Sequence, residues 1–156
     1  FDFILCDSPA GIEKGAFLAM YYADRAVVVV NPEVSSVRDS DRILGLLSSK
    51  TKKAEDGGRI IEHLLLTRYN PARVEKQEML SIADVEEILG LKVVGVIPEA
   101  PEVLQSSNLG NPVILNEESD AGQAYTDAVA RILGEDRPMR FTSVEKKSFF
   151  SKIFGG

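Results

Sequence analysis

The stretch FDFILCDSPAGIEKGAF, residues 1–17, decides the fold that the sequence predicts. An apolar run ends at Asp7, and a proline, a glycine and helix-forming residues follow it. Three more short apolar segments occur downstream, at residues 26–30, 64–67 and 93–97. These segments and residues 3–6 are continuous rather than alternating, which is typical of strands covered on both faces of a parallel sheet.

Stretches with helical spacing separate the apolar segments, over residues 12–22, 35–53 and 81–89. The last begins with a capping box formed by Ser81 and Asp84, and Gly90 ends it. Strand and helix therefore alternate. This order predicts an α/β fold with a doubly wound, mostly parallel sheet and helices on both of its faces.

The carboxyl-terminal half of the sequence indicates where the domain ends. Residues 98–113 read as a loop, a short helix and a turn, and an amphipathic helix over 119–133 closes the domain. Glycine, proline and charge then break the pattern. We therefore expect a domain over residues 1–134, a linker over 135–144 and an amphipathic helix over 145–156.

Composition excludes several classes of protein. The chain has 156 residues, 44% hydrophobic and 27% charged, as in one ordinary globular domain. Its 18 basic and 24 acidic residues give a net charge of -6, so we expect no nucleic acid as a partner. No secretory signal is found, and no apolar run approaches the ~18 residues of a membrane span.

The single cysteine and the first residue carry two further expectations. Cys6 has no partner for a disulfide, which favours a reducing cytoplasm, and inside a strand it would be a packed thiol rather than a nucleophile. The chain begins with Phe1 and a strand that no turn precedes. We therefore interpret it as the carboxyl-terminal part of a longer protein.

Four polar residues, Asp7, Asn31, Asn70 and Glu99, follow the predicted strands. Ligands of open parallel sheets bind beyond the carboxyl ends of the strands, so we expect these residues at one edge. A strand that ends in Asp before a glycine-containing turn is similar to the Walker B and switch segment of nucleotide triphosphatases. The alternative is that Asp7 only caps the helix that begins near residue 12 and Gly11 only makes the turn.

Longer stretches narrow this similarity to a family. CDSPAGIEKGA (6–16), NPEVSSVRDSDRILGLL (31–47), HLLLTRYNPARV (63–74) and VVGVIPE (93–99) together resemble the deviant Walker A ATPases, which include the plasmid-partition ATPases. Within that family the resemblance is to the septum-site-determining ATPases of bacterial cell division, and it covers essentially the whole chain. It implies a P-loop NTPase-like fold that lacks its amino-terminal strands.

The resemblance also implies roles for individual residues toward ATP and Mg²⁺. Asp7 would be the catalytic carboxylate near the attacking water, and would hold Mg²⁺ through water. Ser8, Pro9 and Gly11 would form the switch loop that senses the γ-phosphate.

In the family, the residue corresponding to Asn70 reads adenine, and a loop corresponding to Pro98 and Glu99 closes over the base. Asp39 matches a position near the dimer and partner surface. Each has a structural alternative, because Asn70 could be a turn residue, Pro98 a strand terminator and Asp39 a solvated acid in the first turn of a helix.

One expected motif is absent from the 156 residues. No G-x-x-x-x-G-K-[ST] stretch occurs, so the amides and cations of a phosphate loop are missing. This polypeptide alone is therefore not expected to hydrolyse ATP. His63 is the only histidine, so the sequence offers few residues for a metal site or a Ser-His pair. We expect His63 to be structural or at the surface.

The last twelve residues have the pattern of a helix that lies on a membrane. Apolar side chains at helical spacing share one arc and lysines flank them: Phe149, Phe150, Ile153 and Phe154, with Lys146, Lys147 and Lys152. Residues 137–156 contain five basic residues and one acid, a local charge of +4 on an acidic protein. We expect this segment to bind anionic lipid. The alternative is a terminal helix that packs on its own domain.

Together these features predict a switch at the cytoplasmic membrane. The resemblance implies an ATP-dependent homodimer, peripheral on the inner face of the membrane, that recruits the division inhibitor MinC and is discharged by MinE. Two alternatives remain open: another ATPase of the family, for plasmid partition or flagellar number, and a non-catalytic membrane adaptor.

Overall fold

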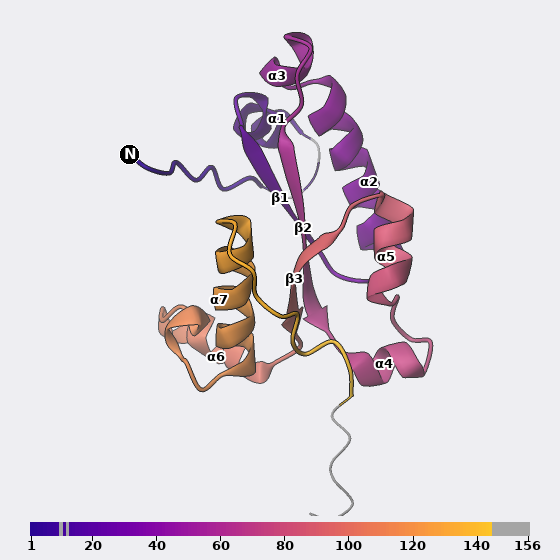
Figure 1. Ribbon diagram of the computed structural model, residues 1–156, viewed down its shortest axis with the longest axis vertical. Coiled ribbons are helices and arrows are strands. Elements are labelled where there is room, and N and C mark those ends of the chain that lie inside the picture. Colours follow the sequence, from indigo (N-terminus) through magenta and orange to yellow (C-terminus); the bar gives the residue numbers. More distant parts are fainter. Residues whose placement is uncertain (10, 12, 145–156) are drawn as a thin grey trace, which may run out of the picture.

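A three-stranded parallel sheet forms the centre of the molecule in the computed structural model, which describes residues 1–9, 11 and 13–144 (Figure 1). The strands β1 (Arg25–Val30), β2 (Ile61–Tyr69) and β3 (Val93–Pro98) lie in the order β1-β2-β3. Both pairings are parallel, with Val30 opposite Leu66 and Leu66 opposite Val96. Three of the four predicted strands are confirmed, and β2 is longer than its apolar run.

Helices cover both faces of this sheet, as the sequence predicts. On one face, α2 (Val34–Ser49) and α5 (Ile82–Leu89) enclose the larger core with apolar residues of all three strands. On the other face, α7 (Asp120–Ile132) packs on β3 and β2 through Ala121, Ala124 and Ala128. Four other helices and a 3₁₀ turn connect these elements: α1 (Lys14–Tyr21), α3 (Lys52–Glu55), α4 (Pro71–Glu75), α6 (Pro101–Leu109) and η1 (Val113–Leu115).

Local signals explain where several helices begin and end. The predicted capping box is present at α5, where Ser81 and Asp84 bond each other's backbone amides. Gly90 ends that helix with a φ of 66°, a conformation that glycine adopts at little cost. The long helix expected over 35–53 is divided into α2 and α3. The hydroxyl of Thr51 accepts a hydrogen bond from the backbone amide of Ala54, so Thr51 caps a new helix, α3.

A small residue on the strand allows α7 to approach β3 closely. A Cβ atom placed on Gly95 would lie 2.5 Å from the Cβ atom of Ala128 and 2.7 Å from Cδ1 of Leu65. Any side chain at residue 95 would therefore separate the helix from the sheet.

The amino-terminal segment corrects two predictions. Residues 1–9 contain no strand, and their chain runs away from the sheet (Figure 1). Cys6 is exposed, so the prediction of a packed thiol is wrong. A strand needs a neighbour for its backbone hydrogen bonds, and no strand of the described part of the chain pairs with this segment.

Strand β1 corrects a third prediction, because one of its faces is open. Val27 and Val29 are 44% and 58% exposed, whereas Val28 and Val30 are buried in the larger core. The continuous apolar run predicts burial on both faces, which holds for the centres of β2 and β3 but not for β1. No neighbouring strand in the described ranges covers the free edge of β1.

Candidate functional site at the carboxyl edge of the sheet

Asn31, Asn70 and Glu99 stand one after each strand at the carboxyl edge of the sheet. All three strands run in the same direction, so the residue that follows each strand lies at the same end. This is the edge where open parallel sheets bind ligands. The structure therefore brings together three of the four predicted polar residues.

Asn31 ties the edge together rather than facing outward. Its side-chain oxygen Oδ1 accepts a hydrogen bond of 3.0 Å from the hydroxyl of Thr67 in β2. Its backbone amide donates to Oγ of Ser36 at the start of α2, over 3.2 Å. Asn31 thus fixes the end of β1 to the neighbouring strand and to the following helix.

Asn70 stabilises a helix and also has a side-chain donor group at the edge. Its side-chain oxygen Oδ1 accepts hydrogen bonds from the backbone amides of Ala72 and Arg73, so it caps α4, as the turn-residue alternative predicts. Its amide nitrogen donates to the carboxylate of Glu99 over 3.2 Å. A side-chain amide carries two N–H groups, and among the described residues only Glu99 accepts from Asn70, so a second donor could serve a ligand.

Pro98 and Glu99 lie directly beyond Asn70. Pro98 is the last residue of β3, where a residue without an N–H is tolerated, and the amide of Glu99 donates to the carbonyl of Tyr69 over 2.9 Å. The Glu99 carboxylate is 3.9 Å from the guanidinium of Arg68. The edge thus presents a donor and an acceptor side by side.

Arg68 is a feature that the sequence analysis missed. Its φ is 56°, a conformation that costs a residue with a side chain about 1–2 kcal/mol. The parallel pairing of β2 with β3 is irregular between Leu66 and Tyr69, which is where Arg68 lies. No simple sequence signal marks such an irregularity.

Asp7 and the switch loop lie outside this cluster. Asp7, Ser8 and Pro9 are exposed on the segment that forms no strand. Within the described residues, no hydrogen bond or ion pair joins Asp7 to Asn31, Asn70 or Glu99. Gly11 has a φ of 96°, so the predicted turn requires glycine there. The roles of these residues toward phosphate and metal stay predictions.

Asp39 lies on the outer side of α2. Its side chain is 76% exposed and 3.5 Å from the guanidinium of Arg42, one turn further along the helix. An exposed ion pair of this kind contributes little to stability. Its position is compatible with a partner surface, and its role also stays a prediction.

The other titratable groups of the described residues form no second cluster. His63 lies within β2, where burial, with a smaller contribution from Arg25, lowers its pKa. Its Nε2 atom is buried, and no residue in the described part of the chain forms a hydrogen bond with it. In the described ranges, no group of three His, Cys, Asp or Glu side chains is placed to hold a metal ion.

An open pocket of about 440 Å³ beside α6 and η1 was not predicted either. Its walls combine apolar residues, including Val103, Pro112 and Ile114, with the ring of Tyr125 and with polar residues such as Asn111. Sequence pattern does not reveal such a space, because it depends on how α6 packs against η1 and α7.

Comparison with known proteins extends the resemblance. The chain is 62% identical over 157 residues to the septum site-determining protein MinD of Escherichia coli (strain K12), and 61% identical over 156 residues to that of Neisseria meningitidis serogroup B. Each match covers 100% of this chain and 58% of the relative, so the chain spans little more than half of the relatives' length. No family model matches.

A solved structure agrees with these relatives. The MinC:MinD cell division protein complex of Aquifex aeolicus is matched with a TM-score of 0.78 and 41% identity, over 88% of this chain and 53% of that chain. The fold prediction of a P-loop ATPase-like α/β domain is confirmed by this likeness and by the parallel sheet. Over the whole of its own length, this chain belongs to the MinD family of septum site-determining proteins.

Proposed function

We propose that this chain is part of an ATP-dependent switch that positions the division septum by cycling between the cytoplasm and the inner face of the cell membrane. One observation carries the proposal: the identity of 62% to MinD of E. coli over the whole chain. The carboxyl edge of the sheet with Asn70 and Glu99, here called the nucleotide edge, supports it.

The edge fits the base of ATP. The free N–H of Asn70 is suited to a ring nitrogen of adenine, and the Glu99 carboxylate is suited to the exocyclic amino group. Guanine presents a carbonyl oxygen in place of that amino group, which the Glu99 carboxylate would repel. Asn70 and Glu99 would therefore both hold the base and select it, with Pro98 ending the strand beneath.

The described residues fit Mg²⁺ only in part. Magnesium in nucleotide sites is held by one or two carboxylates together with phosphates and water. Asp7 would supply one carboxylate, through water. Among the described residues, no group of three acidic, histidine or cysteine side chains that includes Asp7 is placed to hold a metal ion. The ion would neutralise phosphate charge when bound. Ser8, Pro9 and Gly11 would form the switch loop that responds to the γ-phosphate, with Gly11 bringing its backbone amide close to phosphate.

Catalysis belongs to the whole protein rather than to this chain. The phosphate-loop motif does not occur in these 156 residues, and without its amides and cations phosphoryl transfer lacks most of its charge stabilisation. We therefore expect no ATP hydrolysis by this polypeptide alone.

The membrane segment is proposed from sequence, because residues 145–156 lie outside the described part of the chain. Its predicted apolar arc is Phe149, Phe150, Ile153 and Phe154, and its lysines are Lys146, Lys147 and Lys152. Four buried apolar side chains contribute about 6–12 kcal/mol. Ordering about nine residues costs ~1–2 kcal/mol each, so the two terms nearly cancel.

That balance makes membrane binding depend on dimerisation. One copy would bind anionic lipid weakly, whereas two copies in an ATP-dependent homodimer would bind about 10²- to 10⁴-fold more strongly. No helix within the described ranges is long and apolar enough to cross a membrane.

Partners follow from the same switch. The Aquifex structure contains MinC with MinD, which supports MinC as a partner of this protein. MinE would discharge the dimer from the membrane. Exposed Asp39 on α2 is our candidate for the dimer or partner surface.

A chimera tests the proposed activity. The chain is fused behind the part of E. coli MinD that precedes the matched region, and ATP hydrolysis is measured with and without anionic vesicles. We expect vesicles to stimulate hydrolysis, and we expect Asp7→Ala to abolish it. Hydrolysis that is indifferent to Asp7→Ala would contradict the role of Asp7, and the absence of any hydrolysis would favour the adaptor.

A further inference from the structure

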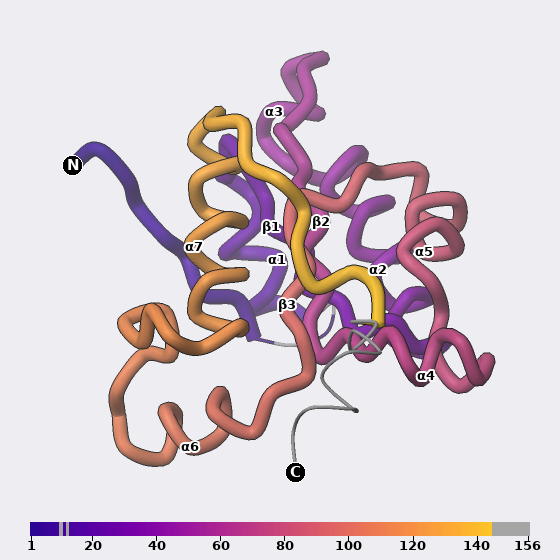
Figure 2. The backbone as a smooth tube through the Cα atoms, turned by 60° about the horizontal axis from the view of Figure 1, so that its bottom comes forward, coloured from indigo at the N-terminus to yellow at the C-terminus, as the bar shows by residue number. Residues whose placement is uncertain are grey.

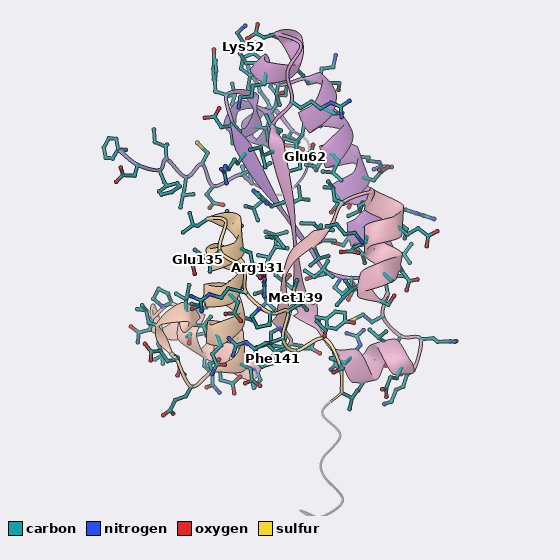
Figure 3. The ribbon with its side chains drawn as sticks, viewed as in Figure 1. Lys52, Glu62, Arg131, Glu135, Met139 and Phe141 are labelled. Atoms are coloured by element: carbon teal, nitrogen blue, oxygen red, sulfur yellow. The ribbon has the colours of Figure 1, made fainter. Side chains whose placement is uncertain are left out.

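The segment that follows α7 doubles back along that helix. Residues 135–141, here called the strap, form no helix or strand, yet they lie beside α7 and β3 in two views (Figures 1 and 2). Glu135, Met139 and Phe141 lie at successive levels along α7, from its last turn toward its first (Figure 3). From the sequence, this segment belongs to the predicted linker over residues 135–144.

Arg131, in the last turn of α7, holds the first half of the strap. Its guanidinium donates to three backbone carbonyls: to Arg137 over 2.9 Å, to Pro138 over 2.5 Å and to Val94 of β3 over 2.8 Å. One side chain thus joins the helix, the strap and the sheet. Hydrogen bonds from a charged donor are stronger than those between neutral groups.

A partly buried ion pair holds the second half. The guanidinium of Arg140 is 2.6 Å from the carboxylate of Asp127, a side chain that is only 8% exposed, and it also donates to Gln123 over 2.6 Å. Arg140 lies over the ring of Phe141, 5.4 Å from its centroid. Phe141 packs against the smaller core.

Because of these contacts, the described chain ends at the carboxyl end of the sheet and not at the opposite end, where α7 ends. The partners of the strap run from Arg131 back to Gln123, so the strap is antiparallel to α7, and a helix of 13 residues is about 20 Å long. The helix begins at the carboxyl edge, and the strap ends on the same side of the sheet as α4, which follows Asn70 (Figure 1).

We propose that the strap is a positioning element, in which Arg131 and the Asp127–Arg140 pair fix the point from which residues 145–156 reach the membrane. The inference rests on the proposed function, since it assigns residues 145–156 to lipid. With the strap docked, the tether of residues 145–156 starts after Phe141, at the end of the sheet where α4 lies, and consists of residues 142–144. With the strap released, the tether starts after Gly134, at the opposite end of α7.

The expected effect follows from the length of the tether. Release lengthens it from residues 142–144 to residues 135–144, about threefold. Effective concentration falls roughly as the -3/2 power of tether length, so a dimer with released straps should bind vesicles on the order of 5-fold more weakly. A monomer, which inserts one segment, should show no such change.

The experiment uses the chimera with a non-hydrolysable ATP analogue or ADP, and vesicles that contain an anionic phospholipid. Asp127→Asn removes the charge that holds Arg140, and Asp136→Asn makes the same charge change on the strap at an exposed residue with no described side-chain partner. Arg131→Lys is a second variant that keeps the charge but loses the planar fork. Cleavage by trypsin after Arg140, dimerisation and vesicle affinity are measured for each.

We expect Asp127→Asn and Arg131→Lys to accelerate cleavage after Arg140, because a released strap fits a protease more readily, and to weaken vesicle binding of the ATP-analogue dimer about 5-fold. Dimerisation and the weak binding with ADP should stay as in the parent and in Asp136→Asn. Unchanged cleavage would show that these residues do not hold the strap. Faster cleavage with the vesicle affinity of Asp136→Asn would also overturn the inference. A parent that binds no vesicles in either state would instead refute the proposed function.

Discussion

The side-chain amide of Asn70 donates a 3.2 Å hydrogen bond to the carboxylate of Glu99, across the ends of the neighbouring strands β2 and β3. The same Asn70 caps α4 with its carbonyl oxygen. The cap of α4 and the proposed contact with the base would thus share one side chain, and substitutions can separate the two.

Asn70→Asp should separate the cap from the binding function. Aspartate keeps an oxygen that can cap α4, so the helix should stay intact. It lacks the free N–H and adds a charge beside Glu99, so we expect ATP affinity to fall about tenfold, the worth of roughly 1.4 kcal/mol. Calorimetric titration of the chimera measures the affinity, and affinity equal to that of the parent would remove Asn70 from the base site.

Glu99→Gln should reduce the preference for adenine. A neutral amide can donate to the carbonyl oxygen of guanine, whereas the carboxylate only accepts. We expect the ratio of ATP to GTP affinity to fall about tenfold, mainly through better GTP binding. Glu102→Gln, at an exposed acid in the first turn of α6, is the matched control. An unchanged ratio would exclude Glu99 as the selecting residue.

Gly95→Ala should destabilise the domain. The new methyl group would lie 2.5 Å from Cβ of Ala128, so α7 must move, at a cost of about 1–3 kcal/mol. Gly45→Ala is the control, because its Cβ would meet nothing within 4 Å in α2, and there alanine should stabilise by about 0.5–1 kcal/mol. Urea denaturation of the chimera measures both. Equal effects of the two substitutions would contradict the close helix–sheet packing.

His63 should make stability depend on pH. Burial, and to a lesser extent Arg25, lowers its pKa in the folded state below the unfolded value of ~6.5. The unfolded state therefore binds more protons as the pH falls through this range, so the free energy of unfolding should decrease below about pH 6.5.

The matched variant is His63→Gln, which cannot titrate. The free energy of unfolding is measured in urea at pH 7.5 and at pH 5.5 for the parent and the variant. The parent should lose more stability between these two values. A loss that is as large in His63→Gln would assign the pH dependence to other groups.

Local pattern predicted the parts of the fold that depend on local chemistry. The buried centres of β2 and β3, the capping box of Ser81 and Asp84, and the stop at Gly90 are all present. The prediction of a strand over residues 3–6 was wrong for a physical reason. Apolar character is a property of the segment alone, but a strand needs a second strand beside it for its hydrogen bonds.

The site was predicted to a similar extent. Asn31, Asn70 and Glu99 meet because parallel strands share an edge, which topology alone dictates. Arg68 and the strap were missed, because their conformations depend on tertiary contacts. The one usable signal for the strap was Asp127, an acid among the buried residues of α7, followed by arginines beyond the helix.

Nucleotide-controlled attachment to lipid tests the central claim most directly. The chimera is sedimented with anionic vesicles in ATP and in ADP, beside the variant Phe150→Glu, which places a charge in the predicted apolar arc. We predict sedimentation of the parent in ATP, at least 100-fold weaker binding in ADP, and none for Phe150→Glu. Equal binding in both nucleotides, or binding that survives Phe150→Glu, would contradict the account.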